Sequence, residues 1–166
     1  MKTGNEDTAR NYSEVVEFWF GADIDDADKL LAASKRWFEK NATFDNEIKA
    51  RFNAWPDAAI SGELDDWSVD DQGTLALIIV LDQFPRNLYR NQAKSFAYDA
   101  WALNHALDAL ERGLHPRLHP MQAVFLFLPL EHSEDADMQQ HCVDGLQALE
   151  KQHTGIWQKK IAGFLR

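Results

Sequence analysis

The spacing of apolar residues is that of helices along the whole chain. Four large apolar residues follow one another at spacings of four, four and three positions, namely Phe44, Ile48, Phe52 and Trp55. These spacings place the four side chains on one face of a helix. Segments in which Val, Ile or Thr alternate with polar residues between Asn-Gly or Asp-Gly turns, which are typical of strands, do not occur. The sequence therefore predicts an all-α fold.

Seven helices and one further short helix are expected. Ser13 and Ser133 are predicted as N-caps, Gly21 and Gly113 end two helices, and Pro56 interrupts a third. The expected helices span residues 13–20, 27–39, 43–62, 71–84, 94–113, 120–128 and 133–151, and the short one begins near 154. Short loops between them favour antiparallel helical hairpins. At 166 residues the chain is expected to form a single domain, 1–166.

Charge and cysteine content exclude several classes of protein. A formal net charge of −10 argues against a nucleic-acid partner, because a phosphate backbone is bound by clustered Lys and Arg side chains. Cys142 is the single cysteine, so no intramolecular disulfide can form, and the opening “MKTGNEDTAR” lacks the apolar core of a signal peptide. The apolar runs “LALIIVL” and “VFLFLPL” are far shorter than the roughly 20 residues of a membrane helix. We therefore expect a cytoplasmic protein without a membrane partner.

Alternating helix directions would bring three polar segments to one pole of the fold. These segments are “WFEKNATFD”, “FPRNLYRN” and “PLEHSED”. The segments expected at the opposite pole, “SGELDDWSVDD” and “GLHPRLHP”, have the composition of ordinary solvated connections, and we expect His115 and His119 at the surface there. Chemically distinctive side chains would thus gather at one end, although they are far apart in the sequence.

The segment “VLDQFPRNLYRN” follows the most apolar run of the chain. Pro85 has no amide hydrogen and should end or kink the helix that this run forms. The carbonyl groups of the last turn would then lack partners, and Arg86 or Asn87 can donate to them. Helix capping of this kind accounts for part of the polar cluster.

Asp82 and Gln83 are not explained by capping. They extend a helix that is expected to be buried, where an unpaired carboxylate is very costly, so Asp82 should have a cationic or donating partner. Arg86, Arg90 and His132 are the candidates. Two interpretations remain open, a buried Asp–Arg pair that fixes the loop and a polar pocket in which the Arg side chain binds a carboxylate or phosphate.

The segment “EHSED” repeats the pattern of an apolar run, a proline and then titratable groups. His132 precedes the expected cap Ser133 and could act as a general base, oriented by Glu131 or Glu134. Acidic clusters are common at helix starts, and no His-Glu-x-x-His helix is present, so we predict no metal site. Glycine-rich phosphate loops are also absent.

Four stretches together resemble the bacterial domain-of-unknown-function 924 family: “VVEFWFG”, “WFEKNATFD”, “LALIIVLDQFPRNLYRNQAKSFAYDAWAL” and “FLFLPLEHSEDADMQQ”. The resemblance covers about Val15 to Gly145, and the combination of “LDQFPRN” with “PLEHSED” is its most specific part. It implies a tetratricopeptide-like, right-handed helical array, and it implies no particular activity. The residues of this chain that follow the family pattern are Asp82, Gln83, Phe84, Pro85, Arg86, Asn87, Tyr89, Arg90, Glu131, His132, Ser133, Glu134 and Gln139.

The chain departs from the family pattern near its end. Family members usually continue with a segment like F-G-R-F-P-H-R-N, whereas His153 is followed here by “TGIWQKKIAGFLR”. A last helix returning to the motif-rich pole would carry that segment into the site. The resemblance therefore implies a site without the Arg, His and Asn of that segment.

Two functions of different classes follow from these residues. The first is a site for a small, anionic ligand at the motif-rich pole, with hydrolysis as the expected reaction if the chain is an enzyme. Its catalytic candidates are Asp82, Arg86, Glu131 and His132, and its ligand-binding candidates are Gln83, Asn87, Tyr89, Arg90, Glu134, Trp37 and Asp45. The alternative is a protein–protein interaction module that receives a peptide in an aromatic groove, without catalysis. No particular cofactor is indicated.

Overall fold

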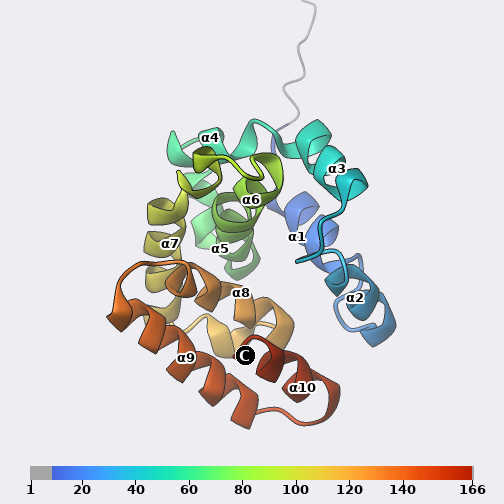
Figure 1. Cartoon of the computed structure of the whole chain (residues 1–166), viewed down its shortest axis with the longest axis vertical. Helices are drawn as coiled ribbons and strands as arrows, with labels where there is room; N and C mark the ends of the chain where they lie inside the picture. Colours follow the sequence, from blue (N-terminus) through green and yellow to red (C-terminus); the bar gives the residue numbers. More distant parts are fainter. Residues whose placement is uncertain (1–8, 166) are drawn as a thin grey trace, which may run out of the picture.

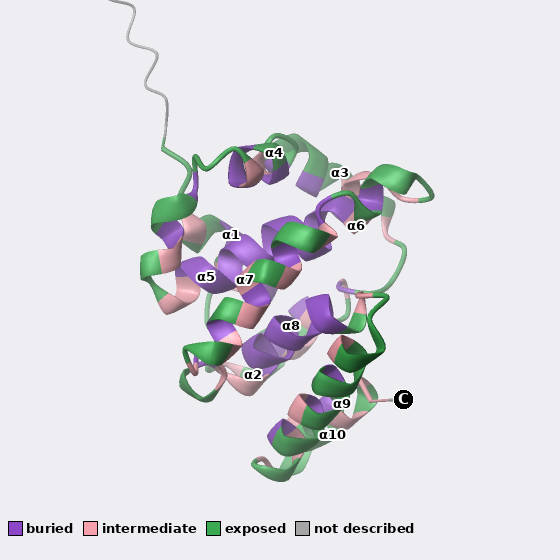
Figure 2. Ribbon diagram, turned by 90° about the vertical axis from the view of Figure 1, so that its left-hand side faces the viewer, coloured by how far each residue is buried: buried purple, intermediate pink, exposed green. Residues whose placement is uncertain are grey.

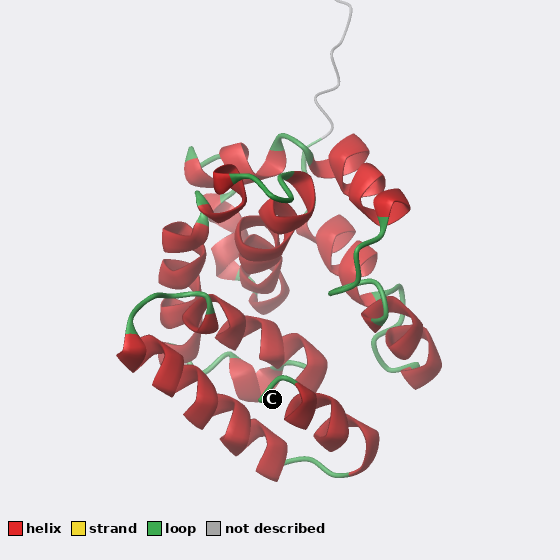
Figure 3. Ribbon diagram, viewed as in Figure 1, coloured by secondary structure: helices red, strands yellow, loops and turns green. Residues whose placement is uncertain are grey.

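The computed structural model describes residues 9–165, and every regular element among them is a helix (Figures 1 and 3). Three short 3-10 helices, Asp65–Val69, Ala93–Phe96 and His115–Arg117, lie between the longer ones. The α-helices are α1 (Tyr12–Phe20), α2 (Ala27–Ser34), α3 (Ala42–Phe52), α4 (Trp55–Ile60), α5 (Asp71–Ile78), α6 (Phe84–Leu88), α7 (Asp99–Glu111), α8 (Pro120–Glu131), α9 (Ala136–Lys151) and α10 (Gly155–Gly163). The all-α prediction is confirmed.

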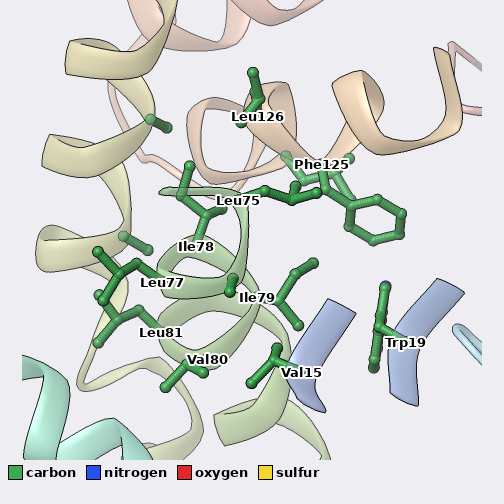
Figure 4. Close-up of a cluster of buried hydrophobic side chains, with 14 of the residues drawn as sticks. Val15, Trp19, Leu75, Leu77, Ile78, Ile79, Val80, Leu81, Phe125 and Leu126 are labelled. Carbon is green, nitrogen blue, oxygen red and sulfur yellow. The ribbon is translucent and has the colours of Figure 1, made fainter. Parts of the chain in front are cut away.

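The helices α5 and α8 form the buried centre of this array. α1 and α7 pack against α5, while α7, α9 and α10 pack against α8. Both central helices are mostly buried, whereas α9 has an exposed outer side (Figure 2). One cluster of buried apolar side chains extends from Val15 in α1 to Ile161 in α10, and Figure 4 shows its centre. Each helix among residues 9–165 is too short or too polar to span a bilayer.

Two predicted helix caps are displaced by two positions. The side chain of Asn11, not of Ser13, caps α1, because it accepts a hydrogen bond from the Ser13 amide at 2.9 Å. Asp135 caps α9 and accepts from the Asp137 amide at 2.8 Å. Ser133 instead accepts from the Asp135 amide, so it shapes the turn before α9. Asn and Asp are as good at N-caps as Ser, which is why residue type alone did not locate the cap.

The predicted helix over residues 27–39 ends earlier, at Ser34. After that residue the chain turns back toward α1, and Trp37 becomes buried with its indole nitrogen 2.8 Å from the carbonyl oxygen of Trp19. The two indole rings are stacked at 6.2 Å. Aromatic packing against α1 therefore outweighs continuation of the helix.

The prolines act in two different ways. Pro56 lies in the first turn of α4, so it separates α4 from α3 as predicted. Pro129 lies inside α8, which was expected to stop at Leu128 but continues to Glu131. The helix resumes its ladder beyond the proline, where the His132 amide donates to the Leu128 carbonyl at 3.0 Å. Burial of α8 by its neighbours holds this turn in place.

His115 and His119 are partly buried, which corrects the expectation that they lie at the surface. His119 caps α8, since its Nδ1 atom accepts from the Met121 amide at 3.1 Å. An accepting Nδ1 atom must be unprotonated, and burial lowers the pKa of His119 in agreement with this role. Burial also lowers the pKa of His115.

Candidate functional site

The central helix changes its winding where the polar cluster begins. α5 ends at Ile78, the next turn is a π-helix over Ile79–Gln83, and α6 follows from Phe84. In this wider turn the Phe84 amide donates to the carbonyl of Ile79, five residues back. Pro85 then falls in the first turn of α6, where its missing amide hydrogen is tolerated. The helical path therefore continues through Pro85 into α6, by way of the π-helical turn. This corrects the prediction that the helix ends at residue 84.

Asp82 is fully buried on this π-helical turn, at 0% exposure. Its Oδ1 atom is 2.8 Å from Nδ1 of His132 and 3.3 Å from Nη1 of Arg86. Its Oδ2 atom accepts from Nε2 of Gln83 at 2.8 Å. The carboxylate thus has three partners, and two of the three predicted cations are among them. Arg90, the third, lies elsewhere.

Arg86 bridges two carboxylates. Its Nη1 and Nη2 atoms donate to the two carboxylate oxygens of Asp99 at 2.9 and 3.0 Å, and Nη1 also donates to the backbone carbonyl of Asp82 at 2.6 Å. The bond to this carbonyl is the predicted cap of the open helix turn. The guanidinium group lies over the ring of Phe96, at 5.5 Å from its centroid. Two negative groups therefore compensate the charge of Arg86 before any ligand arrives.

A second polar cluster joins α3 to α6. Asp45 in the first turn of α3 accepts from Asn87 at 2.9 Å, and from the Nε and Nη2 atoms of Arg90 at 2.6 and 3.1 Å. Asn87, predicted as an alternative helix cap, is used here instead. The pKa of Arg90 is raised, chiefly by its hydrogen bond to Asp45. These three side chains satisfy one another and tie two helices together.

His132 lies between two clefts. The first, which we call the aromatic cleft, has a volume of 470 Å³ and is lined by Ser34, Trp37, Phe38, Met121, Leu128, Glu131, His132, Lys160, Gly163 and Phe164. The second, the arginine cleft, has a volume of 660 Å³ and is lined by Arg86, Phe96, Asp99, Ala100, Leu103, Pro129, His132, Ser133 and Glu134. The imidazole is bound on its Nδ1 side by Asp82, while its side chain keeps 24% of its surface exposed. Among the described residues, Nε2 has no hydrogen-bond partner.

The other predicted site residues are distributed around this centre. Glu131 lines the aromatic cleft and Glu134 lines the arginine cleft. The carboxylate that orients His132 is that of Asp82, which corrects the expectation of Glu131 or Glu134. Trp37 contributes to one wall of the aromatic cleft. The ring of Tyr89 lies 4.6 Å from the ammonium group of Lys94 and lines neither cleft.

Sequence reasoning missed several residues of the two clefts, among them two beside Arg86 and two at the C-terminal end of the described chain. Asp99 and Phe96 flank Arg86, while Lys160 lies in α10 and Phe164 directly follows that helix. Asp99 begins α7, a position where an acidic residue is ordinary, so its residue type gave no signal. Lys160 and Phe164 could have been found from the expected return of the last helix to this pole.

The described residues contain no group of three or more His, Cys, Asp or Glu side chains placed to hold a metal ion. The potential ligands near His132 are used differently, since Asp82 bonds to the imidazole and to Arg86 and Gln83.

Fold and clefts together define a class of protein, an all-helical array in which the buried Asp82, just after α5, meets His132, just after α8, at one pole. The chain belongs to the family described as “Bacterial protein of unknown function (DUF924)”, whose model matches residues 15–165. It is also similar to the solved structure of a protein of unknown function, ATU0120, from Agrobacterium tumefaciens. The two are 33% identical with a TM-score of 0.75, over 93% of this chain and 80% of that one. No curated protein matches the sequence.

Proposed function

We propose that this pole binds a small molecule and that His132 acts on it as a general base in a hydrolytic reaction. The observation that carries the proposal is the 2.8 Å contact between Nδ1 of His132 and Oδ1 of the buried Asp82, at a position where the same imidazole lines two clefts. A carboxylate at Nδ1 favours the tautomer that has its lone pair on Nε2. That nitrogen can then accept a proton.

The proposed step uses water as the nucleophile. Nε2 of His132 removes one proton from a water molecule, and the oxygen forms a bond to the electrophilic atom of the substrate. The imidazolium ion then returns the proton to the leaving group as its bond breaks, so that protons and charges balance. Asp82 stabilises the imidazolium ion through the bond at Nδ1. Arg86 holds Asp82 in place and acts as a positioning residue in this scheme.

The anionic ligand predicted from the sequence would meet competition at Arg86. Both of its terminal nitrogens already bond to Asp99, whose side chain is 26% exposed. A ligand carboxylate would have to displace that side chain. Support for an anion site at Arg86 is therefore weaker than support for general-base chemistry at His132.

The test is a panel of activated carboxylic esters, phosphoric esters and glycosides. Their hydrolysis is measured with the wild type and three variants. We expect His132→Ala to lower turnover by about 10²-fold to 10⁴-fold, as is typical for loss of a general base. Asp82→Asn should also lower turnover, because it changes the hydrogen bond that sets the tautomer. His141→Ala removes an exposed histidine of α9 and should leave turnover unchanged. Unchanged turnover of a folded His132→Ala protein would refute the proposal.

The interaction module stays a second candidate, supported by one observation. Phe96 is 61% exposed beside the arginine cleft, whose further walls include Ala100, Leu103 and Pro129. An apolar peptide side chain would fit there without needing His132. Peptide binding lost in Phe96→Ala and retained in His132→Ala would favour this function. The cytoplasmic location and the absence of a nucleic-acid partner stay predictions from the sequence.

A further inference from the structure

Two side chains of opposite charge line the aromatic cleft. Glu131 stands at the end of α8 and Lys160 in α10, and both side chains are exposed. Neither takes part in any ion pair formed among residues 9–165. The neighbouring arginine cleft is different, because its cation is already bound by carboxylates.

The body of the same cleft is aromatic. Phe38 is 60% exposed, and its ring packs at 5.6 Å and 80° against the ring of Phe164. Trp37 stands edge-to-face with Phe38 at 6.3 Å. An exposed ring such as that of Phe38, which already makes edge-to-face contacts, can accept a further flat ring in the same way. A volume of 470 Å³ suits a ligand of one ring with a short polar end.

Charge decides which kind of polar end fits. An anion would be attracted by Lys160 and repelled by Glu131, and a cation would meet the reverse. A zwitterion can pair with both and leaves neither charge uncompensated when water is excluded from the cleft. The cleft therefore matches a molecule that carries a carboxylate, an ammonium group and an aromatic body.

We propose that the aromatic cleft binds a zwitterionic small molecule of the chemical class of aromatic amino acids. Lys160 receives its carboxylate, Glu131 its ammonium group, and the rings of Phe38 and Phe164 its apolar body. The proposal rests on the proposed function in that His132 borders the same cleft, so that the zwitterion would be the product released when an ester or amide of such a molecule is hydrolysed. In this proposal Lys160 binds the anionic group of the ligand, a role that the sequence had suggested for Arg86.

Three probes of the same shape and different charge test the proposal by calorimetric titration. They are phenylalanine, 3-phenylpropanoate and 2-phenylethylamine, at one ionic strength and pH 7. Each ion pair at a partly exposed site should contribute up to a fivefold change in affinity. We expect phenylalanine to bind about threefold to fivefold more tightly than either singly charged probe.

Variants of the two charged residues assign the preference. Lys160→Gln should abolish the advantage of phenylalanine over 2-phenylethylamine, and Glu131→Gln its advantage over 3-phenylpropanoate. Lys159→Gln is the matched control, because Lys159 precedes Lys160 in α10 and does not line the cleft. Equal binding of the three probes, an equal effect of the control, or no binding below about 10 mM would overturn the proposal.

The same titrations separate this inference from the proposed function. Suppose that phenylalanine binding depends on Lys160 but that the protein hydrolyses no substrate of the panel. The inference would then stand and the general-base function would be removed. Hydrolysis that depends on His132, without selective binding of phenylalanine, would remove the inference alone.

Discussion

Replacement of Asp82 by alanine should destabilise the fold strongly. The substitution removes the acceptor for three side chains, Gln83, Arg86 and His132, at a position with 0% exposure. Loss of one partner of a buried charge pair typically costs about 3 to 5 kcal/mol. Arg86 keeps its two bonds to Asp99 and its bond to the carbonyl of residue 82, so its share of that cost is reduced.

The expected loss is therefore at the lower end of the range, about 3 kcal/mol. Most of it comes from the buried amide of Gln83 and the imidazole nitrogen of His132, which lose hydrogen bonds to a charged acceptor worth about 1.5 to 3 kcal/mol each and regain part of that through water. For a chain of 166 residues, 1 kcal/mol shifts the melting temperature by about 2 to 4 °C. Asp82→Ala should thus lower the melting temperature by about 9 °C.

Urea and thermal unfolding followed by tryptophan fluorescence measure this loss, since Trp19 and Trp37 are buried. Asp99→Ala is the matched control, because it also removes a carboxylate bound to Arg86 but one that is 26% exposed. We expect the control to cost about 1 kcal/mol. A loss below about 1 kcal/mol for Asp82→Ala, or one equal to that of the control, would refute the reasoning that burial decides the cost.

Three further predictions concern packing, helix capping and pH. Gly145→Ala should cost about 1 to 3 kcal/mol, because its Cβ atom would lie 2.2 Å from the ring of Phe127. Gly163→Ala has open space around the new Cβ atom and should stabilise α10 by about 0.5 to 1 kcal/mol. Urea unfolding measures both changes. Asn41→Ala should cost about 1 kcal/mol through loss of the α3 N-cap, again by urea unfolding. Burial raises the pKa of the Cys142 thiol from 9.0 to about 12, so above pH 9 the unfolded chain loses this proton first. Stability should then fall from pH 9 to about 12, and Cys142→Ala should flatten that fall.

The sequence predicted what depends on periodicity and on the cost of burial. Helical spacing located most of the α-helices, and alternation of helix directions brought His132 to Asp82 from 50 positions away. The argument that a buried carboxylate needs donors identified two of its three partners, Arg86 and His132. Arg90 has the same chemistry but bonds to Asp45, and the choice between two nearby arginines depends on helix rotation. Spacing along the chain does not determine that rotation where the winding changes.

The partners that the sequence did not predict are those whose residue type is ordinary for its position. Asp99 begins α7, as acidic residues commonly do, and only its distance of 2.9 Å to Nη1 of Arg86 distinguishes it. Ser133 has the residue type of a cap, yet Asp135 performs that role. A residue type that fits two roles equally well does not select between them, and tertiary contacts then decide.

One disagreement between expectation and structure, the π-helical turn, falls on the most polar part of the central helix, and this coincidence has a physical reason. A π-helical turn takes in one residue more than an α-helical turn, so every residue after it is rotated by about 100° relative to an uninterrupted α-helix. Ile79, Val80 and Leu81 stay in the core at 0% exposure, while Asp82 on the same turn faces His132. A stable core alone would need neither the irregular turn nor the buried charge, because apolar residues at such sites are often equally stabilising. Local rules of folding are commonly broken at sites kept for function, which supports a functional role for the pair Asp82 and His132.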